Sequence, residues 1–419
     1  MGLLWGGVDC NELAERFGTP LYVFDTGIIR ARCREITSTF LNRWDNTRVR
    51  YASKAFITRA MAKLIHEEGL GLDVVSGGEL YTALSAGFPP EWIEMIGNAK
   101  SREEIAYAVK SGVGRIIVDH PDELDTIEHF AAEKGVTQRV MIRVAPGVDA
   151  HTHAYIATGQ TDSKFGLPNE GPMLPDAIAR ARACKHVELT GLHFHVGSQL
   201  FDTDDYLKAI GKILELMKRL KDTLGFTVRE LNMGGGFGAV ISPKVASMRS
   251  ELYTDAMMKA LTDGCAQFGL EVPRVILEPG RWFVSEAGLT LYTVENVKVL
   301  PNVTYIAVNG GMADNPRLAL YQAEYEAVKV SDPDAEPVGT FSVVGKCCES
   351  GDVLIEKARL PEVRAGDVIG LYNSGAYTFS MASNYNTLAR PAVVFVEDGE
   401  ARLVVERQSM DDLVRGQSL

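Results

Sequence analysis

The sequence has no apolar stretch that approaches the roughly 20 consecutive residues a membrane-spanning helix needs. It also lacks an excess of basic residues, because 43 Lys and Arg stand against 55 Asp and Glu, for a formal net charge of −12. A surface that follows the phosphates of a nucleic acid requires the opposite balance. We therefore expect neither a membrane nor a nucleic acid as a partner.

A secretory signal and paired cysteines are missing as well. The amino-terminal segment has no basic start followed by a long apolar stretch and a small-residue cleavage site. The six cysteines are scattered, without the paired spacing of a metal site or a disulfide framework. Reduced thiols in a cytoplasmic protein are the simplest interpretation, and no metal site is expected.

Short β-branched apolar runs alternate with helix-period segments over the first two thirds of the chain. Eight runs predict strands, at 49–53, 72–75, 93–96, 115–118, 139–143, 187–195, 228–234 and 274–278. Helical segments such as 60–68, 122–134, 206–220 and 252–268 lie between them. This order predicts a (β/α)8 barrel of the TIM type, with an open, doubly wound parallel sheet as the alternative.

The pattern changes after about residue 286, where long helical periodicity is missing. Runs that favour strands follow at 289–299, 304–308, 367–371, 392–396 and 403–406. We therefore predict a carboxyl-terminal all-β domain, a barrel or a sandwich, which the amino-terminal segment with its apolar run at 21–24 completes. The predicted boundaries are 25–285 for the barrel and 1–24 with 286–419 for the β domain.

Polar side chains follow several predicted barrel strands, at the end where barrels of this kind build their active sites. Lys54 follows the first strand, His195 and Ser198 follow the sixth, and Glu278 and Arg281 follow the eighth. A lysine there is either solvated or, once desolvated, able to form a Schiff base. His195 is either a core histidine or a site residue. Glu278 precedes a rigid Pro-Gly corner and either binds a cationic ring nitrogen or forms a surface salt bridge.

The glycine run in NMGGGFG, after the seventh strand, also has two interpretations. It is either a flexible turn or a loop whose backbone N–H groups hold an anion. Gly234, Gly236 and Ala239 fit a loose dinucleotide fingerprint, but Ile-Ser-Pro at 241–243 follows in place of a helix start, which disfavours nicotinamide binding. The adjacent cysteines at 347 and 348 are more typical of packing than of catalysis.

Eight motifs are spread over nearly the whole chain: YASKAF, DVVSGGE, TGQTDSKFG, HFHVGSQ, NMGGGFG, EPGR, CESGD and GAYTFSMASNYN. Together they resemble the barrel-fold, fold-type III pyridoxal-phosphate decarboxylases, and among them the diaminopimelate decarboxylases. The resemblance implies pyridoxal 5'-phosphate as the cofactor. It also implies a homodimer with shared active sites, in which the CESGD segment enters the site of the partner and Asp352 lies near Lys164 of the partner subunit.

The resemblance further implies which residues hold the cofactor. Lys54 resembles the lysine that binds it covalently, His195 the imidazole that stacks on its ring, and Glu278 the carboxylate that faces the pyridine nitrogen. Contacts to the cofactor phosphate are implied for Ser198, Gly235, Gly236 and Tyr377.

Substrate contacts and a proton donor are implied in the same way. Cys348 resembles the catalytic thiol that reprotonates the carbanion, and Glu349 the partner of the distal ammonium of the substrate. Substrate binding is also implied for Arg281, Arg317, Tyr321 and Tyr377.

The implied reaction is decarboxylation of meso-2,6-diaminopimelate at its D centre to L-lysine, the last step of lysine biosynthesis. The nearest alternative is a related decarboxylase that acts on ornithine, lysine, arginine or carboxynorspermidine. Glu349 together with Arg281 and Arg317 favours a substrate with a second carboxylate. A regulatory homologue that binds the cofactor without turnover is a further alternative, which the presence of Lys54, Glu278 and Cys348 disfavours.

Overall fold

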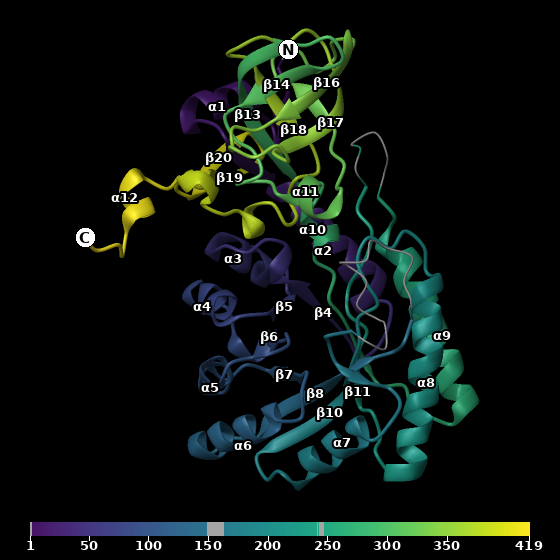
Figure 1. Ribbon diagram of the computed structural model, residues 1–419. Helices are drawn as coiled ribbons and strands as arrows, with labels where there is room; N and C mark the ends of the chain where they lie inside the picture. Colours follow the sequence, from purple (N-terminus) through teal and green to yellow (C-terminus); the bar gives the residue numbers. More distant parts are fainter. Residues whose placement is uncertain (1, 149–162, 241, 243–246) are drawn as a thin grey trace. The chain divides into compact units, whose positions relative to one another are not determined.

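The computed structural model describes residues 2–148, 163–240, 242 and 247–419 (Figure 1). The first five residues of the TGQTDSKFG motif, 158–162, lie outside this part of the chain. The chain forms two units, which we call the barrel unit (33–238 and 248–280) and the β unit (1–32, 239–247 and 281–419). Residues 25–32, 239–247 and 281–285, assigned above to the barrel, group with the β unit.

Eight parallel strands form the barrel, in the order β4-β5-β6-β7-β8-β10-β11-β12, and β12 pairs with β4 to close the circle. Their bounds are β4 Thr47–Ala52, β5 Gly71–Val74, β6 Ile93–Met95, β7 Arg115–Val118, β8 Gln138–Ala145, β10 Val187–His193, β11 Glu230–Asn232 and β12 Arg274–Leu277, and the short β9 (Leu167–Pro168) pairs with β8. An open sheet would leave two unpaired edges. The predicted TIM-type barrel is confirmed, and the doubly wound alternative is excluded.

Helices lie between most of these strands and cover the outside of the barrel (Figure 1). They are α2 Thr26–Ile36, which precedes β4, and α3 Arg59–Glu67, α4 Gly77–Ser85, α5 Arg102–Ser111, α6 Glu123–Lys134, α7 Met173–Ala183, α8 Asp204–Leu224 and α9 Ser250–Phe268. Side-chain oxygens of Thr58, Ser76 and Ser101 accept hydrogen bonds from the first turns of α3, α4 and α5. Because such a cap satisfies an N–H that the helix leaves unpaired, it fixes where each helix starts.

The interior of the barrel is layered. A packed apolar layer consists of Ile96, Ile117, Met141 and Ile276. At the amino-terminal ends of the strands, Arg115 on β7 instead donates hydrogen bonds to Glu230 on β11. The opposite, carboxyl-terminal rim carries the candidate site residues described below.

A nine-stranded sheet organises the β unit, with the order β17-β16-β14-β13-β3-β19-β20, and β18 pairs with β13 and β15. The strands are β3 Leu21–Asp25, β13 Gly288–Val299, β14 Thr304–Val308, β15 Ala327–Lys329, β16 Gly339–Val344, β17 Val353–Leu360, β18 Val368–Leu371, β19 Ala392–Glu397 and β20 Glu400–Val405, beside the small hairpin of β1 (Leu4–Trp5) and β2 (Val8–Asp9). The predicted β domain is confirmed. Short helices accompany it: α1 Cys10–Phe17, α10 Arg281–Val284, α11 Arg317–Tyr321 and α12 Met410–Val414.

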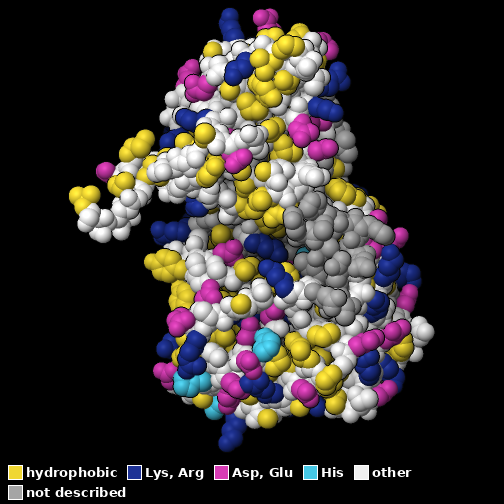
Figure 2. All heavy atoms as spheres, viewed as in Figure 1, with side chains coloured by type: hydrophobic (Ala, Val, Ile, Leu, Met, Phe, Trp, Pro, Cys, Tyr) yellow, Lys and Arg dark blue, Asp and Glu magenta, His cyan; other side chains and the backbone are white. Residues whose placement is uncertain are grey.

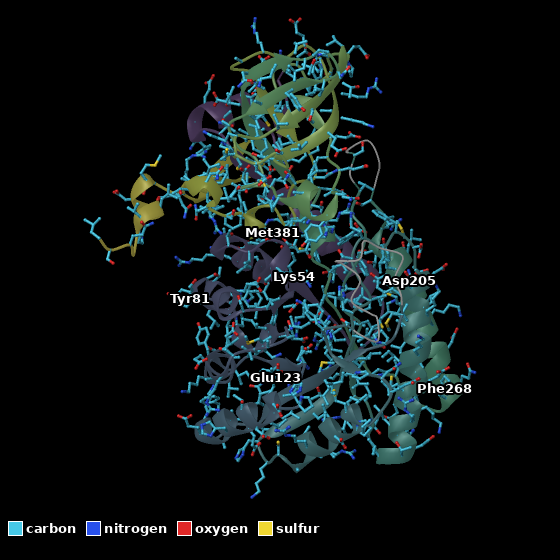
Figure 3. The ribbon with its side chains drawn as sticks, in the orientation of Figure 1. Lys54, Tyr81, Glu123, Asp205, Phe268 and Met381 are labelled. Carbon is cyan, nitrogen blue, oxygen red and sulfur yellow. The ribbon has the colours of Figure 1, made fainter. Side chains whose placement is uncertain are left out.

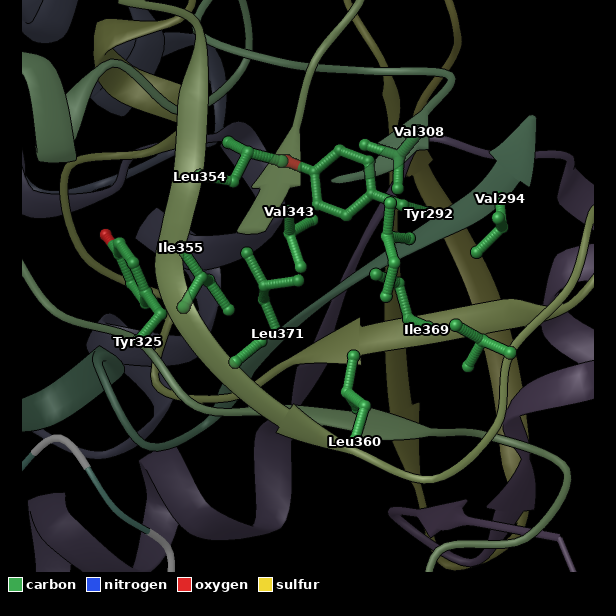
Figure 4. Packing of buried hydrophobic residues seen from close by; sticks show 13 residues of the cluster. Tyr292, Val294, Val308, Tyr325, Val343, Leu354, Ile355, Leu360, Ile369 and Leu371 are labelled. Atoms are coloured by element: carbon green, nitrogen blue, oxygen red, sulfur yellow. The ribbon is translucent and has the colours of Figure 1, made fainter. Parts of the chain in front are cut away.

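An apolar core fills the β unit (Figure 4). Ile306, Val343, Leu360 and Leu371 are fully buried in it, and Tyr292 packs among them. Val343 and Leu360 come from β16 and β17, two strands that the periodicity of the sequence did not predict. The core therefore depends on strands that a simple alternation rule misses.

No helix in the described residues is long and apolar enough to cross a bilayer. On the face drawn in Figure 2, acidic and basic side chains are interspersed over the barrel unit. The net negative charge is therefore not gathered into one patch on that face.

Candidate active site

Lys54 lies directly after β4, where Figure 3 labels it. The strand ends at Ala52, and a short 3₁₀ turn, Ser53–Ala55, carries the lysine. Ser53 and Ala55 are fully buried, whereas the side chain of Lys54 is exposed. The buried neighbours thus fix the backbone while the amine stays accessible at the rim.

Glu278 follows β12 and is only 5% exposed. His193 Nε2 donates to its Oε2 at 3.0 Å, and Asn232 Nδ2 donates to its Oε1 at 2.5 Å. Burial raises the pKa of the Glu278 carboxyl, but the electrostatic effect and hydrogen bond of His193, the hydrogen bond from Asn232 and the positive charge of Lys54 outweigh burial and hold the pKa below its ordinary value. Glu278 is therefore a buried anion at neutral pH.

Asp73 on β5 is a second buried carboxyl at the same rim, and it behaves in the opposite way. It is 1% exposed, and its Oδ1 has no hydrogen-bond partner among the described residues. Burial, and then the negative charge of Glu278, raise the pKa of Asp73 well above its ordinary value, against the opposing effect of Lys54. When two close carboxyls titrate together, one takes the proton first. Asp73 takes it here, and Glu278 stays charged.

His195 follows β10 and is electrically neutral. Burial, and then the positive charges of Lys54 and Arg143, hold the pKa of His195 well below its usual range. The backbone N–H of Gly235 donates to its Nδ1 at 3.2 Å. A neutral imidazole that accepts at Nδ1 carries its proton on Nε2. His195 thus presents an uncharged ring to the rim.

The glycine run after β11 is a packed loop and not a flexible turn. A Cβ at Gly235 would lie 2.1 Å from the carbonyl oxygen of Glu278, and one at Gly236 would lie 2.4 Å from that of Gly197. Gly236 also takes a φ of +110°, which side chains rarely adopt. The loop therefore brings bare backbone close to the half-buried Ser198. Among the described residues the next helix starts at residue 250, so no helix entry of a dinucleotide fold is seen directly after this run.

Two arginines and two tyrosines form a second group, within the β unit. The guanidinium of Arg281 lies 4.6 Å from the ring centroid of Tyr377, and that of Arg317 lies 5.4 Å from the rings of both Tyr377 and Tyr321. Both arginines are 8% exposed. Burial and the charge of Arg317 lower the pKa of Arg281 to about 10. Two buried cations this close favour an anion, and a carboxylate matches the planar geometry of guanidinium.

Tyr377, which both arginines face, has a strained backbone. Its φ is +61°, in the left-handed region that favours glycine. Strain of this kind persists where the surroundings hold a residue in place, and it occurs often at binding sites.

The two adjacent cysteines lie in different environments, on the loop after β16. Cys347 is buried, and burial together with the nearby Asp352 raises the pKa of its thiol to about 11. Cys348 and Glu349 are exposed, and the backbone N–H of Cys348 donates to Asn386 Oδ1 at 2.7 Å. The loop therefore buries one cysteine and presents the other with the neighbouring carboxylate.

Asp352 anchors this loop from inside. It is 3% exposed, and its two carboxylate oxygens accept the backbone N–H groups of Met312 at 2.6 Å and of Cys347 at 2.7 Å. The expected position of Asp352 near Lys164 of the partner subunit stays a prediction, and each carboxylate oxygen can still accept a further hydrogen bond.

The predicted site residues thus gather in two groups. The barrel rim brings together Lys54, His195, Ser198, Gly235, Gly236 and Glu278, and the β unit carries Arg281, Arg317, Tyr321, Tyr377, Cys348 and Glu349. Sequence reasoning did not single out His193, Asn232 or Arg143, which are all buried at or near the ends of barrel strands. The available signal was a polar residue inside an otherwise apolar strand.

Comparison with known proteins gives consistent matches along the chain. Residues 26–285 match the family "Pyridoxal-dependent decarboxylase, pyridoxal binding domain". The chain is 46% identical over 411 residues to the diaminopimelate decarboxylase of Bacillus subtilis (strain 168), covering 98% of this chain and 94% of that protein, and 47% identical over 406 residues to that of Bacillus methanolicus, covering 97% and 94%. A crystal structure of the diaminopimelate decarboxylase of M. jannaschii in complex with L-lysine aligns with a TM-score of 0.90 at 33% identity, covering 97% of this chain and 94% of that one.

Proposed function

Because the chain belongs to the family of pyridoxal-dependent decarboxylases, we propose that it decarboxylates meso-2,6-diaminopimelate to L-lysine with pyridoxal 5'-phosphate as its cofactor. The observation that carries this proposal is the barrel rim, where a buried, ionised Glu278 lies close enough to Lys54 for their charges to interact. A charged carboxylate in a buried site requires a cationic partner, and the pyridine nitrogen of the cofactor is one.

The residues at the rim fit this cofactor. Lys54 supplies an accessible amine for its covalent attachment. A Cβ at Gly235 or Gly236 would meet backbone oxygen, so only glycine fits this loop, and we assign the cofactor phosphate to its backbone, with the hydroxyl of Ser198 beside it. The neutral ring of His195 is suited to lie against a flat, uncharged aromatic surface.

When it is bound, the cofactor supplies an electron sink for the pair of electrons that loss of carbon dioxide leaves on the substrate. The chain supplies the rest. Glu278 keeps a proton on the ring nitrogen, which deepens that sink. His195 covers one face of the ring and keeps water away from it. Cys348 is proposed to return a proton to the α-carbon, with Sγ as the donor atom.

We assign substrate recognition to the group in the β unit. Arg281 and Arg317, both facing Tyr377, hold a carboxylate of the substrate, and Tyr321 supports Arg317. Glu349 pairs with the distal ammonium. Ornithine and lysine have only the carboxylate that is lost, whereas diaminopimelate retains a second one, and for this reason we favour diaminopimelate over the alternative substrates.

The first experiment is product analysis with a panel of diamino acids, with Lys54→Ala as the inactive control. Lysine formed from diaminopimelate supports the proposal. Cadaverine from lysine or putrescine from ornithine at comparable rates would assign the chain to the related decarboxylases. Cofactor binding with no turnover of any substrate would make it a regulatory homologue.

We further propose a cytoplasmic homodimer in which Cys348 and Glu349 of one subunit complete the site of the other. Lys54→Ala and Cys348→Ala are each expected to be inactive. After subunit exchange, a mixed dimer carries one site with both defects and one with neither. Half of the dimers are mixed at random exchange, so about a quarter of wild-type activity returns, on the premise that complete sites act independently. Exchange proven by mass spectrometry without any recovery would contradict the shared site.

A further inference from the structure

Two buried polar residues at the barrel rim have no role in the proposed function. His193 ends β10 and Asn232 ends β11, and the two lie directly opposite each other in the register of these neighbouring strands. Both are 0% exposed. Burial of polar groups is costly unless they are hydrogen-bonded, so their partners indicate what they do.

Each of these residues holds one oxygen of Glu278. His193 Nε2 donates to Oε2 at 3.0 Å, and Asn232 Nδ2 donates to Oε1 at 2.5 Å. The backbone N–H of Gly234 donates to Asn232 Oδ1 at 2.9 Å, and the backbone N–H of Glu278 donates to the carbonyl of Gly234 at 2.7 Å. Because Oδ1 is already the acceptor, the amide of Asn232 cannot be flipped, and its Nδ2 must face the carboxylate.

The two ring nitrogens of His193 lie in different surroundings. Nδ1 is buried and has no hydrogen-bond partner among the described residues. Nε2 faces a carboxylate oxygen, which only accepts, so Nε2 carries a proton and donates it. His193 is therefore arranged to donate one hydrogen bond, and Glu278 receives it.

The second hydrogen of the Asn232 amide goes deeper into the barrel. It is donated to Glu94 Oε2 at 3.1 Å, and Glu94, 0% exposed, also accepts a hydrogen bond from Arg50 Nε at 3.2 Å. Arg115 lies 3.5 Å from the same carboxylate. Arg50 and Arg115 thus balance the charge of Glu94. The amide of Asn232 lies between the carboxylates of Glu94 and Glu278, which would otherwise repel each other.

We propose that His193 and Asn232 are positioning residues that keep Glu278 ionised and aimed, so that Glu278 in turn keeps a proton on the ring nitrogen of the cofactor. The last step rests on the proposed function. The placement of Glu278 by His193 and Asn232 does not depend on the proposed function, because it follows from the hydrogen bonds that they donate to its carboxylate.

The charged groups that face Glu278 divide into two sets. Lys54, Arg143 and, when it is protonated, His193 favour its anion, whereas Asp73 and Glu94 oppose it when they are charged. Burial also opposes it. The hydrogen bonds from His193 and Asn232 offset the effect of burial on the Glu278 pKa. When they are lost, the pKa rises, and the carboxyl takes up a proton at a higher pH.

The decisive variants are His193→Phe, which removes the donor and keeps an aromatic ring, and His193→Gln, which keeps an amide N–H at similar reach. Asn232→Leu removes the other donor at similar volume. As a matched control, His186→Phe removes the histidine of another His–Glu pair, 3.0 Å from Glu128 and partly exposed, away from this site. Circular dichroism and thermal melts verify that each variant is folded.

The first measurement follows the Glu278 carboxyl by infrared difference titration of the full chain without cofactor, with Glu278→Gln identifying its band. His193→Phe is expected to raise the apparent pKa of Glu278 by about 1–2 units, because a lost hydrogen bond to the charged form acts in this direction. His193→Gln is expected to restore most of the shift, and His186→Phe to leave it unchanged. A folded His193→Phe variant with an unchanged Glu278 titration would overturn the proposal.

The second measurement is the ¹⁵N chemical shift of the ring nitrogen in bound, labelled cofactor. A protonated nitrogen in the wild type that loses its proton in His193→Phe and regains it in His193→Gln supports the proposal. The two proposals fail separately. A wild type that neither binds the cofactor nor turns over diaminopimelate contradicts the proposed function, while the infrared titration still decides whether His193 and Asn232 hold Glu278.

Discussion

The interior of the barrel and the core of the β unit bury different kinds of side chain. Inside the barrel, Glu94, His193 and Asn232 are fully buried and linked through hydrogen bonds to Glu278 at the rim. The core of the β unit is formed by aliphatic side chains and two tyrosines (Figure 4). Burial of apolar side chains stabilises the fold through an interaction that has no preferred direction. A buried polar network, in contrast, fixes the position and charge of particular atoms. The interior of the barrel thus contains a polar network, whereas this core of the β unit is apolar.

The largest expected effect concerns Lys54 at the rim. Lys54→Ala should lower the rate by about 10⁶-fold, because removal of a residue that forms a covalent bond with the reacting group has effects of this size. The protein should also lose its covalent cofactor label after borohydride reduction, as measured by peptide mass spectrometry. Labelling of a different lysine in the wild type would show that the rim does not hold the cofactor as assigned.

The arginines of the β unit set the next largest effect. Diaminopimelate should exceed lysine and ornithine in kcat/KM by on the order of 10⁴-fold, because an analogue that lacks the second carboxylate leaves a buried arginine without its partner. Steady-state kinetics with the three substrates measure the ratio. Comparable values would remove the specificity that we assign to Arg281 and Arg317.

Stability provides a direct test of the two interiors. Glu94→Gln should lower the free energy of unfolding by about 3–5 kcal/mol, because it leaves Arg50 and Arg115 facing a neutral group in a buried site. Leu360→Ala in the core of the β unit should cost about 2–5 kcal/mol through the cavity it leaves.

Activity should separate the two variants where stability does not. Glu94→Gln should also lower activity in the folded protein, since Glu94 shares the Asn232 amide with Glu278, whereas Leu360→Ala should leave activity in the folded protein nearly unchanged. Urea unfolding and kcat measured at low temperature provide both readouts. If Glu94→Gln, like Leu360→Ala, lowered stability but left kcat unchanged, the polar interior of the barrel would have no effect on activity.

The smallest effect depends on Asp314, a buried carboxyl of the β unit whose pKa is raised. It is 4% exposed, it accepts hydrogen bonds from the Tyr292 hydroxyl at 2.6 Å and the Gly311 N–H at 2.9 Å, and burial raises its pKa to about 7. Since the folded pKa lies above the unfolded one, the stabilisation is present in full below about pH 4 and is lost as the pH rises through 7.

Between pH 5 and pH 8 the wild type should therefore lose about 2–3 kcal/mol of unfolding free energy relative to Asp314→Asn. Denaturant titrations of both proteins at the two pH values provide the measurement. A variant whose stability changes with pH as the wild type does would place the proton on another group.

The rim could be predicted from the sequence because parallel strands in a barrel present their carboxyl ends on one side. Lys54, His195 and Glu278 each follow a recognisable apolar run, so their common placement needed only the order of strands. His193 and Asn232 could not be found in this way, because their role depends on a register between strands about 40 residues apart in the sequence. The charge difference between Asp73 and Glu278 likewise depends on burial that no local pattern encodes.

The missed strands of the β unit have a different cause. β16 and β17 pair with two shifts of register, between Phe341 and Val343 and between Val343 and Val344. Each shift breaks the two-residue alternation by which a strand is recognised. The burial of Asp352 could not be predicted from its neighbours either, because it depends on how the loop folds its backbone N–H groups around the carboxylate.

The position of β3 has a consequence for how the protein is made. Residues 21–25 leave the ribosome early, yet the two strands that flank them are β13, about 265 residues later, and β19, about 370 residues later. All barrel strands are synthesised before β19, so the barrel has time to form while β3 still has an unpaired edge. An unpaired apolar edge is a template for pairing with other chains, and contacts this distant in sequence form slowly. Nascent chains that stall between residues 280 and 397 are therefore the ones expected to aggregate or to need a chaperone, even though their barrel sequence is complete.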